Sequence, residues 1–336
     1  MQFLEKSIVM DSKRPVQDLF VPLLVNIAGS HVEAVILYGS HLLGANPGRY
    51  SAYDLVLIVD DYRGFYDALY SAKIIHRSPL LMAIVSKFLP PTVIRLAPEG
   101  DGGVLAKCLV IDRSDFERSL RIGRARDHFM ISRMMQKVQV VYSRSDVIGE
   151  WVQETLWVAR YGVLSWATLW IDQPFDSESL AREMLRICYR SENRPESSGR
   201  SNAVFLAQQE ELIECYSNVL AEAEIKGEVK REGGGYRTLI PASKIRRLQR
   251  LLYFKISKLR VTLSWLKHMV TFEGWLPYIV RKVERRTGNQ IRLTKIEKML
   301  PLLFLWPRVL FVFWNRPERE VEPSQNVETA NDQGES

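Results

Sequence analysis

Two apolar runs separated by a glycine turn constrain the fold more than any other part of the chain. The first, Ala34 to Leu37, leads into Tyr38-Gly39-Ser40, and the second, Tyr53 to Val59, carries one acid, Asp54. Short apolar runs bounded by turn residues are typical of buried strands. We therefore expect two successive strands. A carboxylate inside an apolar strand needs a partner or a metal ion.

Composition indicates a folded protein rather than a disordered one. The 336 residues are 46% apolar and 25% charged, which is enough for a real core and for two domains. Cys108, Cys188 and Cys215 have no spacing suited to zinc or redox pairs, and an odd number argues against a disulfide framework. The first residues contain acids and no apolar segment long enough for a signal peptide. We therefore expect a protein that stays in the cytoplasm.

Basic charge is concentrated near the C-terminus. Residues 237–316 hold 18 Lys and Arg against three acids, a net charge of +15, whereas the whole chain carries +7. The rest of the chain is therefore acidic. This asymmetry predicts a polyanionic partner, either nucleic acid or an anionic lipid surface, for that region alone.

Periodicity predicts an α+β domain with a mixed sheet, followed by helices. We expect helices at 15–28 and 62–76, strands at 92–96 and 104–111, a helix or membrane-facing loop at 78–89, and a helix from an N-cap at Asp112 or Ser114 to about Met135. Helical periodicity then covers 147–170, 177–189 and 202–223, and returns at 242–270 and 275–286 after the glycine-rich break at 232–235. The predicted domains are an α+β domain at 1–145, an all-α domain at 146–232, a basic amphipathic region at 237–316 and a disordered tail at 317–336.

The glycine turn and Asp54 together suggest nucleotidyl transfer, so the domain at 1–145 is predicted to be nucleotidyltransferase-like. Gly39 allows backbone N–H groups to approach a phosphate, and the Ser40 hydroxyl adds a donor. Such sites commonly hold two metal ions between carboxylates of an Asp-x-Asp strand, but here Ala52 stands two residues before Asp54. A second ligand must then come from elsewhere, and Asp112 is the best candidate.

Lys107, on the same predicted strand as Asp112, suits the neutralisation of a triphosphate. Strand alternation places Lys107 and Asp112 on opposite faces, so both reach one cleft only if the strand ends or bulges between them. The alternative is equally open: Lys107 extends to solvent, Asp112 caps the next helix, and Gly39 sits in an ordinary hairpin.

The segments Leu37-Tyr38-Gly39-Ser40 and Tyr53-Asp54-Leu55-Val56 resemble the mitochondrial-type phosphatidate cytidylyltransferases. This is the translocator assembly and maintenance protein family of the polymerase-beta-like nucleotidyltransferase superfamily, and it also has one acid where Asp-x-Asp is usual. Weaker similarity continues through 88–93, 107–110 and 132–138, over about the first two-thirds of the chain.

The resemblance implies a magnesium-dependent enzyme that makes CDP-diacylglycerol and pyrophosphate from CTP and phosphatidate on a membrane surface. It implies catalytic roles for Asp54 and Lys107 and a Mg²⁺ ion at Asp54, for which Asp112 remains the candidate second ligand. The nucleotide-binding residues would be Tyr38, Gly39, Ser40, Arg133 and Lys137.

The basic region is consistent with a peripheral membrane protein. Cations flank apolar residues at helical spacing between Lys244 and Arg260, as in helices that lie in an anionic headgroup plane. Met299 to Trp314 is nearly all apolar but is short for a transmembrane span. We expect a location on the inner face of the membrane. The alternative is a helical hairpin packed on the protein's own core.

Two other functions remain open from the sequence. One is a nucleotidyltransferase that acts on RNA or another polar acceptor, with the basic region binding phosphates. The aromatic residues gathered towards the C-terminus favour a membrane interface over such a nucleic-acid groove. The other is a degenerate transferase used as a binding module, which the absence of an acid at Ala52 favours.

Overall fold

The structure is a computed structural model that describes residues 16–43, 52–97, 104–191, 199–239 and 243–271, with single positions 280, 284 and 294. All of these except Thr294 belong to one compact unit, Met1–Arg194 with Gly199–Arg292; Thr294 belongs to the second unit, Pro195–Ser198 with Leu293–Ser336. The predicted helix at 275–286, apart from its positions 280 and 284, the apolar run at 299–314 and the tail at 317–336 lie outside the described residues.

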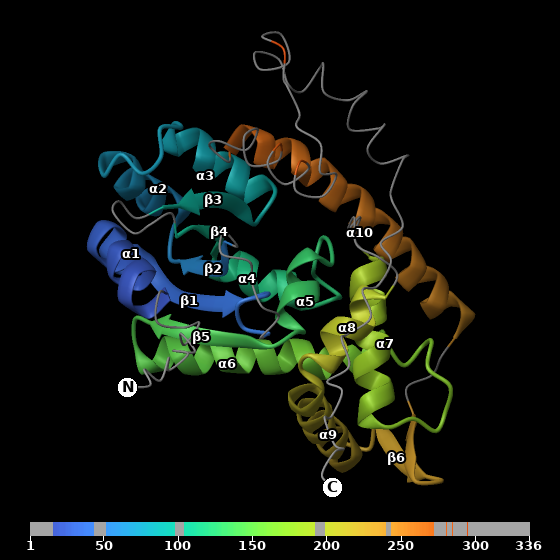
Figure 1. The fold of residues 1–336 in the computed structure, drawn as a ribbon. Helices are drawn as coiled ribbons and strands as arrows, with labels where there is room; N and C mark the ends of the chain where they lie inside the picture. The colour runs from blue at the N-terminus through green and yellow to red at the C-terminus, as the bar shows by residue number, and fades with distance from the viewer. Residues whose placement is uncertain are drawn as a thin grey trace, which may run out of the picture. The chain divides into compact units, whose positions relative to one another are not determined.

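A five-stranded mixed sheet with strand order β3-β4-β2-β1-β5 organises this unit (Figure 1). Only β2 and β4 run parallel; the other neighbouring pairs are antiparallel. The predicted α+β class with a mixed sheet is confirmed. The strands are β1 (Val32–Tyr38), β2 (Tyr53–Val59), β3 (Thr92–Leu96), β4 (Ala106–Asp112) and β5 (Val138–Ser143).

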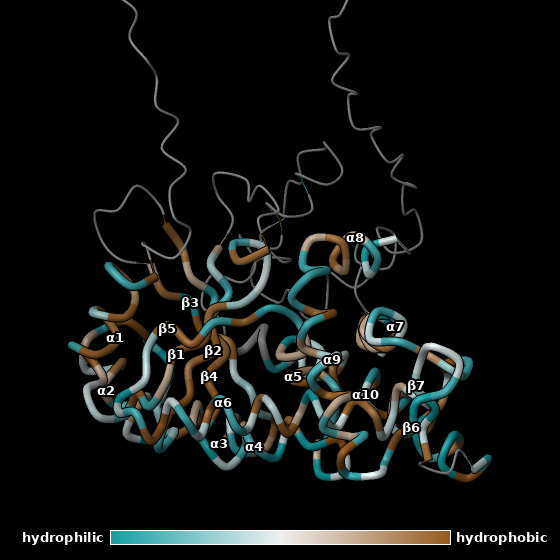
Figure 2. Tube along the Cα trace, turned by 90° about the horizontal axis from the view of Figure 1, so that it is seen from below, coloured by the Kyte–Doolittle hydropathy of each residue, from teal (hydrophilic) through white to brown (hydrophobic). Residues whose placement is uncertain are grey.

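Both faces of the central strands are covered, which explains why β1 and β2 read as continuous apolar runs rather than alternating ones. Every residue of β1 is buried. Figure 2 shows the same strands as largely hydrophobic. One face packs against Phe20, Leu24 and Phe65 among others. The elements that cover this face are η1 (Val16–Phe20), α1 (Val21–Ala28), α2 (Tyr62–Ser71) and α3 (Pro79–Phe88).

The other face of the sheet shares one hydrophobic core with the later helices. Ile36 and Val56 from the sheet belong to the same core as Trp166, Leu185 and Tyr216. This core therefore continues across the domain boundary predicted at residues 145 and 146. The helices are α4 (Arg113–Leu120), α5 (Phe129–Met134), α6 (Asp146–Tyr161), η3 (Gly162–Ser165), α7 (Ser177–Arg190), α8 (Arg200–Leu206) and α9 (Gln209–Ile225).

Several elements differ from the sequence prediction. The expected helix from Asp112 to Met135 is two helices, because α4 ends at Leu120 and the following charged segment contains Gly123, a poor helix former. The segment 138–143, where no element was predicted, is strand β5 and pairs with β1. Helix α2 ends at Ser71 instead of His76.

The glycine-rich break is a tight β-hairpin. Gly233 and Gly234 have φ of 57° and 82°, the positive values that a two-residue hairpin turn requires. They join β6 (Val229–Glu232) to β7 (Gly235–Thr238). The predicted all-α region therefore ends in a strand.

Helix α10 (Lys244–Thr271), the long orange helix of Figure 1, follows the predicted range of 242–270 closely. One of its faces packs on the protein. The Ser257 hydroxyl accepts a hydrogen bond from the His128 backbone N–H at 2.7 Å, and Val261 is buried. Further along, the Lys267 amine donates to the backbone carbonyls of Leu89 and Pro91.

The buried Lys267 should make stability depend on pH. Burial lowers the pKa of this amine from 10.5 to about 7, and the Asp127 carboxylate offsets only part of that effect. Between these two values the unfolded chain binds the proton and the folded chain does not, so the free energy of unfolding rises with pH. We expect a contribution of about 2 kcal/mol between pH 7 and pH 9, because each pH unit adds about 1.4 kcal/mol at most.

Urea denaturation at several pH values measures this effect. The variant Lys267→Met should lose this rise, whereas Lys258→Met, at an exposed position of the same helix, should keep it. Parallel pH curves for the wild type and Lys267→Met would show that the amine stays protonated in the folded state.

Candidate functional site

Gly39 and Asp54 are in direct contact at one end of the sheet. Tyr38, the last residue of β1, pairs with Asp54 of β2, and Gly39 follows with a φ of 84°. A Cβ atom on Gly39 would lie 2.7 Å from Asp54 Oδ2. The carboxylate therefore lies against the backbone of the turn. The Leu42 N–H closes that turn by donating to the Gly39 carbonyl at 3.0 Å.

The variant Gly39→Ala tests this contact. We expect it to destabilise the protein by about 1 to 3 kcal/mol, because alanine resists a positive φ and its methyl group would push the Asp54 carboxylate away. Urea denaturation measures the change. Gly29→Ala is the matched control, since Gly29 also has a positive φ, of 52°, but an added Cβ there would meet nothing within 4 Å. Equal losses in the two variants would exclude an energetic role for the contact with Asp54.

A row of polar side chains crosses the sheet at Asp54. Lys107 of β4 pairs with Asp54, and Arg95 of β3 pairs with Lys107. Paired residues on neighbouring strands point to the same face, and such strands lie about 4.8 Å apart. The structure thus brings the predicted pair Asp54 and Lys107 together and adds Arg95. Sequence reasoning missed Arg95, although it is the one charged residue in Thr92–Leu96.

An aromatic stack holds the turn against β2. The rings of His41 and Tyr53 lie 3.9 Å apart between centroids and 20° from parallel. His41 follows Ser40 directly, and Tyr53 precedes Asp54. The stack therefore fixes the turn beside the carboxylate. Burial raises the pKa of the Tyr53 hydroxyl, which keeps it neutral at ordinary pH.

Asp112 lies at the opposite end of the sheet from Asp54. It pairs with Val59, five residues along β2, which is about 17 Å at 3.3 Å per residue. Its carboxylate caps α4 by accepting from the Asp115 N–H at 2.7 Å and forms an ion pair with Lys87 at 2.9 Å. The two carboxylates predicted to share a metal site cannot hold one ion, and Asp112 is instead the helix N-cap.

Lys137 lies near the Asp54 end, directly before β5, whereas Arg133 lies on α5. Val138, the residue after Lys137, pairs with Tyr38, which in turn pairs with Asp54. The Lys137 amine forms an ion pair with Glu211. The Arg133 guanidinium donates to the Phe129 carbonyl at 2.9 Å and covers the Phe129 ring at 3.4 Å. Both cations thus have protein contacts in the structure.

The donor set at Asp54 suits a nucleotide-bound Mg²⁺ ion rather than a closed metal site. Within the described ranges there is no group of three or more His, Cys, Asp or Glu side chains that could hold a metal. Mg²⁺ is usually bound by one or two carboxylates, with substrate phosphates and waters as its other ligands. Asp54 fits that role, and the basic residues Lys107 and Arg95 are paired beside it.

Comparisons with known proteins give little further information. No family model matches the chain, and neither does any curated protein. Among solved structures, the chain is similar to a nucleotidyltransferase-like protein from Exiguobacterium sibiricum 255-15, with 11% identity over 90% of each chain and a TM-score of 0.24. A TM-score this low carries no information about function.

Proposed function

We propose that the chain is a nucleotidyltransferase that uses CTP and Mg²⁺ and transfers the cytidylyl group to phosphatidate. The observation that carries the proposal is the contact of the Gly39 backbone with the Asp54 carboxylate, with Lys107 paired beside it. The choice of CTP and phosphatidate rests on the family resemblance of the sequence around these residues.

Each residue of this site has a distinct role in the proposal. Asp54 would hold the Mg²⁺ ion, which when bound withdraws charge from the phosphates and the reacting oxygens. The N–H groups of the turn and the Ser40 hydroxyl would donate to phosphate oxygens. Lys107 and Arg95 would offset the negative charge of the triphosphate, and Arg133 and Lys137 would approach the nucleotide from the β5 side.

The proposed reaction is a single displacement. A phosphate oxygen of phosphatidate forms a bond to the α-phosphorus of CTP, and the bond from that phosphorus to the bridging oxygen breaks. Pyrophosphate leaves with the bonding electrons, and the products are CDP-diacylglycerol and pyrophosphate. Lys107 would stabilise the charge that develops on the phosphates as this bond breaks.

The exposed surface of α10 supports a lipid acceptor. An apolar stripe runs along this helix at spacings of three and four residues, and each of its residues is at least 46% exposed. Exposed cations lie beside the stripe on the same helix, at Lys244, Arg247, Lys255 and Lys258. The stripe consists of Ile245, Leu248, Leu252, Ile256, Leu259 and Leu263.

An anionic bilayer matches both parts of this surface. A helix of 28 residues is about 42 Å long and can lie in the headgroup plane, with its stripe in the lipid and its cations near the phosphates. A nucleic acid would pair with the cations but leave the apolar stripe in water, so the stripe favours a lipid. None of the helices described is long and apolar enough to span a bilayer. We propose a peripheral location on the inner face of the membrane.

The test is an assay of the purified full chain for Mg²⁺-dependent pyrophosphate release and for incorporation of labelled CTP into lipid. Phosphatidate-containing vesicles serve as acceptor, and ATP, GTP and UTP are compared with CTP. Transfer of another nucleotide, or transfer to RNA instead of lipid, would keep the reaction class and change the substrates. CTP binding without turnover would favour the binding module, for which the lone carboxylate at Asp54 also argues.

A further inference from the structure

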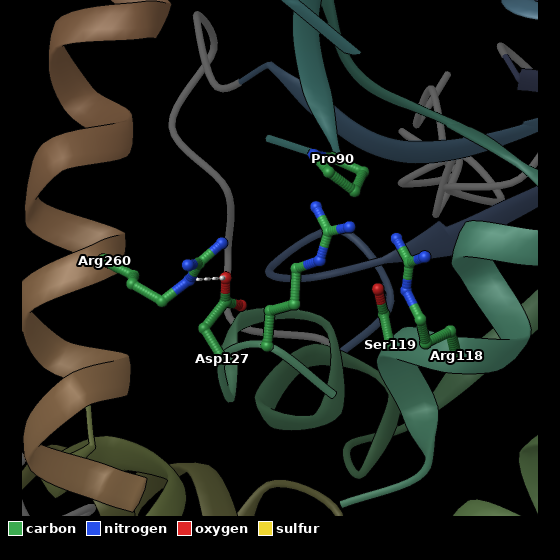
Figure 3. Close-up of a pocket in the computed structure, with 6 residues that line it drawn as sticks. Pro90, Arg118, Ser119, Asp127 and Arg260 are labelled. Atoms are coloured by element: carbon green, nitrogen blue, oxygen red, sulfur yellow. Dashed lines mark ion pairs between the residues drawn. The ribbon is translucent and has the colours of Figure 1, made fainter. Parts of the chain in front are cut away.

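A second cationic site lies at the other end of the sheet from Asp54. Pro90 precedes β3, whose first residue, Thr92, pairs with Val110, close to the Asp112 end of β4. A small pocket that opens to solvent is found there (Figure 3). It is lined by Pro90, Arg118, Ser119, Arg126, Asp127 and Arg260.

The pocket carries an excess of positive charge. Arg118 comes from α4 and Arg260 from α10, on opposite sides of the pocket in Figure 3, and Arg126 lies in the segment before α5. Asp127 is the one acid in its lining. Three guanidinium groups around one carboxylate leave an excess of positive charge, which a further anion would offset.

These arginines have guanidinium N–H donors that their contacts within the protein do not use. The Arg118 guanidinium forms an ion pair with Asp115, so part of its charge is already offset. Arg126 donates to the Phe88 carbonyl at 2.8 Å. A guanidinium has five N–H donors in a planar fork, so these contacts use only part of each group.

Arg260 provides the most direct sign of a missing acceptor. Its Nε atom is buried and has no hydrogen-bond acceptor within the part of the chain that the structure describes. It forms an ion pair with Asp127 Oδ2 at 3.9 Å, a distance too long for a hydrogen bond (Figure 3). A buried donor without an acceptor costs free energy, and an anion in the pocket would remove that cost.

Lys267 adds a fourth basic group beside the pocket. Its amine donates to the carbonyls of Leu89 and Pro91, the residues on either side of Pro90. Side chains from α4, the α4–α5 segment and α10 thus surround the chain before β3 with basic groups. The Ser119 hydroxyl supplies a neutral donor in the same lining.

We propose that this pocket binds a phosphate group, separately from the nucleotide site at Asp54. The planar donor forks of Arg126 and Arg260 suit the oxygens of a phosphate dianion, which can accept from more than one arginine at once. The phosphate has two sources with the same chemistry, free inorganic phosphate and the phosphomonoester headgroup of a lipid. This inference does not depend on the proposed transfer reaction.

Isothermal titration calorimetry of the full chain with inorganic phosphate tests the first source. Arg126→Gln should weaken binding about tenfold, because a charge-assisted hydrogen bond contributes about 1.5 to 3 kcal/mol. Arg124→Gln is the matched control, since Arg124 is exposed two residues away and is not part of the lining. Circular dichroism melting checks that both variants fold. Equal binding by the wild type and Arg126→Gln would overturn the proposal.

Vesicle sedimentation tests the second source. Phosphatidate, a phosphomonoester, is compared with phosphatidylglycerol, a phosphodiester, each mixed into phosphatidylcholine. A lipid headgroup in the pocket predicts a preference for phosphatidate that Arg126→Gln removes and Arg124→Gln keeps. If the wild type binds no inorganic phosphate and has no Arg126-dependent preference for phosphatidate, the pocket binds no phosphate group.

Discussion

Asp54→Asn is expected to lower the rate of pyrophosphate release by a factor on the order of 10³. Asparagine keeps the shape of the side chain and its fit against Gly39, but it loses the charge that would hold Mg²⁺. Removing a single preorganised electrostatic contact from an active site typically costs 10²- to 10³-fold, and here no second carboxylate is paired with Asp54 to compensate. The rate constant kcat, measured across a range of Mg²⁺ concentrations, gives the size of the effect.

Asp67→Asn is the control for this variant. Asp67 lies on α2 and pairs with Arg63 at 2.6 Å on the surface, so its loss should leave kcat unchanged. Thermal melting of both proteins separates a loss of chemistry from a loss of folding. If Asp54→Asn kept more than a tenth of the wild-type rate with the same Mg²⁺ dependence, the reaction would have to occur elsewhere in the protein.

The double variant Leu252→Gln/Leu259→Gln is expected to weaken binding to phosphatidate-containing vesicles at least about 100-fold. The transfer of each leucine side chain from water into an apolar environment is favourable by about 1.5 to 3 kcal/mol of free energy. A tenfold change in affinity corresponds to about 1.4 kcal/mol. The two residues are 57% and 61% exposed, so the fold does not depend on burying them. Co-sedimentation over a range of lipid concentrations measures the affinity.

Leu251→Gln is the control for this double variant, because it changes an exposed leucine outside the stripe. Leu251 is 47% exposed but lies about 100° around the helix from Leu252, outside the stripe, and its replacement should change affinity less than about threefold. Failure of the wild type to sediment with anionic vesicles would exclude the bilayer as the occupant of the stripe. In that case gel filtration tests whether the stripe is a dimer interface. A dimeric wild type and a monomeric double variant would show that a second copy of the chain covers the stripe.

Local pattern was sufficient to predict the elements that form the candidate site. The strands at 53–59 and 92–96 were predicted at their observed bounds, because each is a short apolar run with turn residues or prolines at its ends. The helix at 244–271 followed from its 3.6-residue periodicity. The proximity of Gly39 and Asp54 could also be predicted locally, because these residues lie at the two ends of the connection between two successive strands.

Contacts between distant strands were much harder to predict. Arg95 lies beside Lys107 because of the register in which β3 pairs with β4. Lys107 lies beside Asp54 because of the register in which β4 pairs with β2. No local pattern in the sequence fixes these registers. Sequence reasoning therefore chose Asp112 as the partner of Asp54, although the parallel pairing of β2 and β4 separates these two residues by most of a strand.

Because Gly39 contacts Asp54, the residues at these two positions cannot change independently of each other during evolution. Any side chain at position 39 would begin with a Cβ atom in the space that the Asp54 carboxylate occupies. A homologue with a residue other than glycine at position 39 must therefore carry a smaller side chain at position 54 or move the carboxylate, by a rotamer change or a displaced strand. In either case the acid that defines the site is lost or moved, so glycine at position 39 marks the chains in which Asp54 can act.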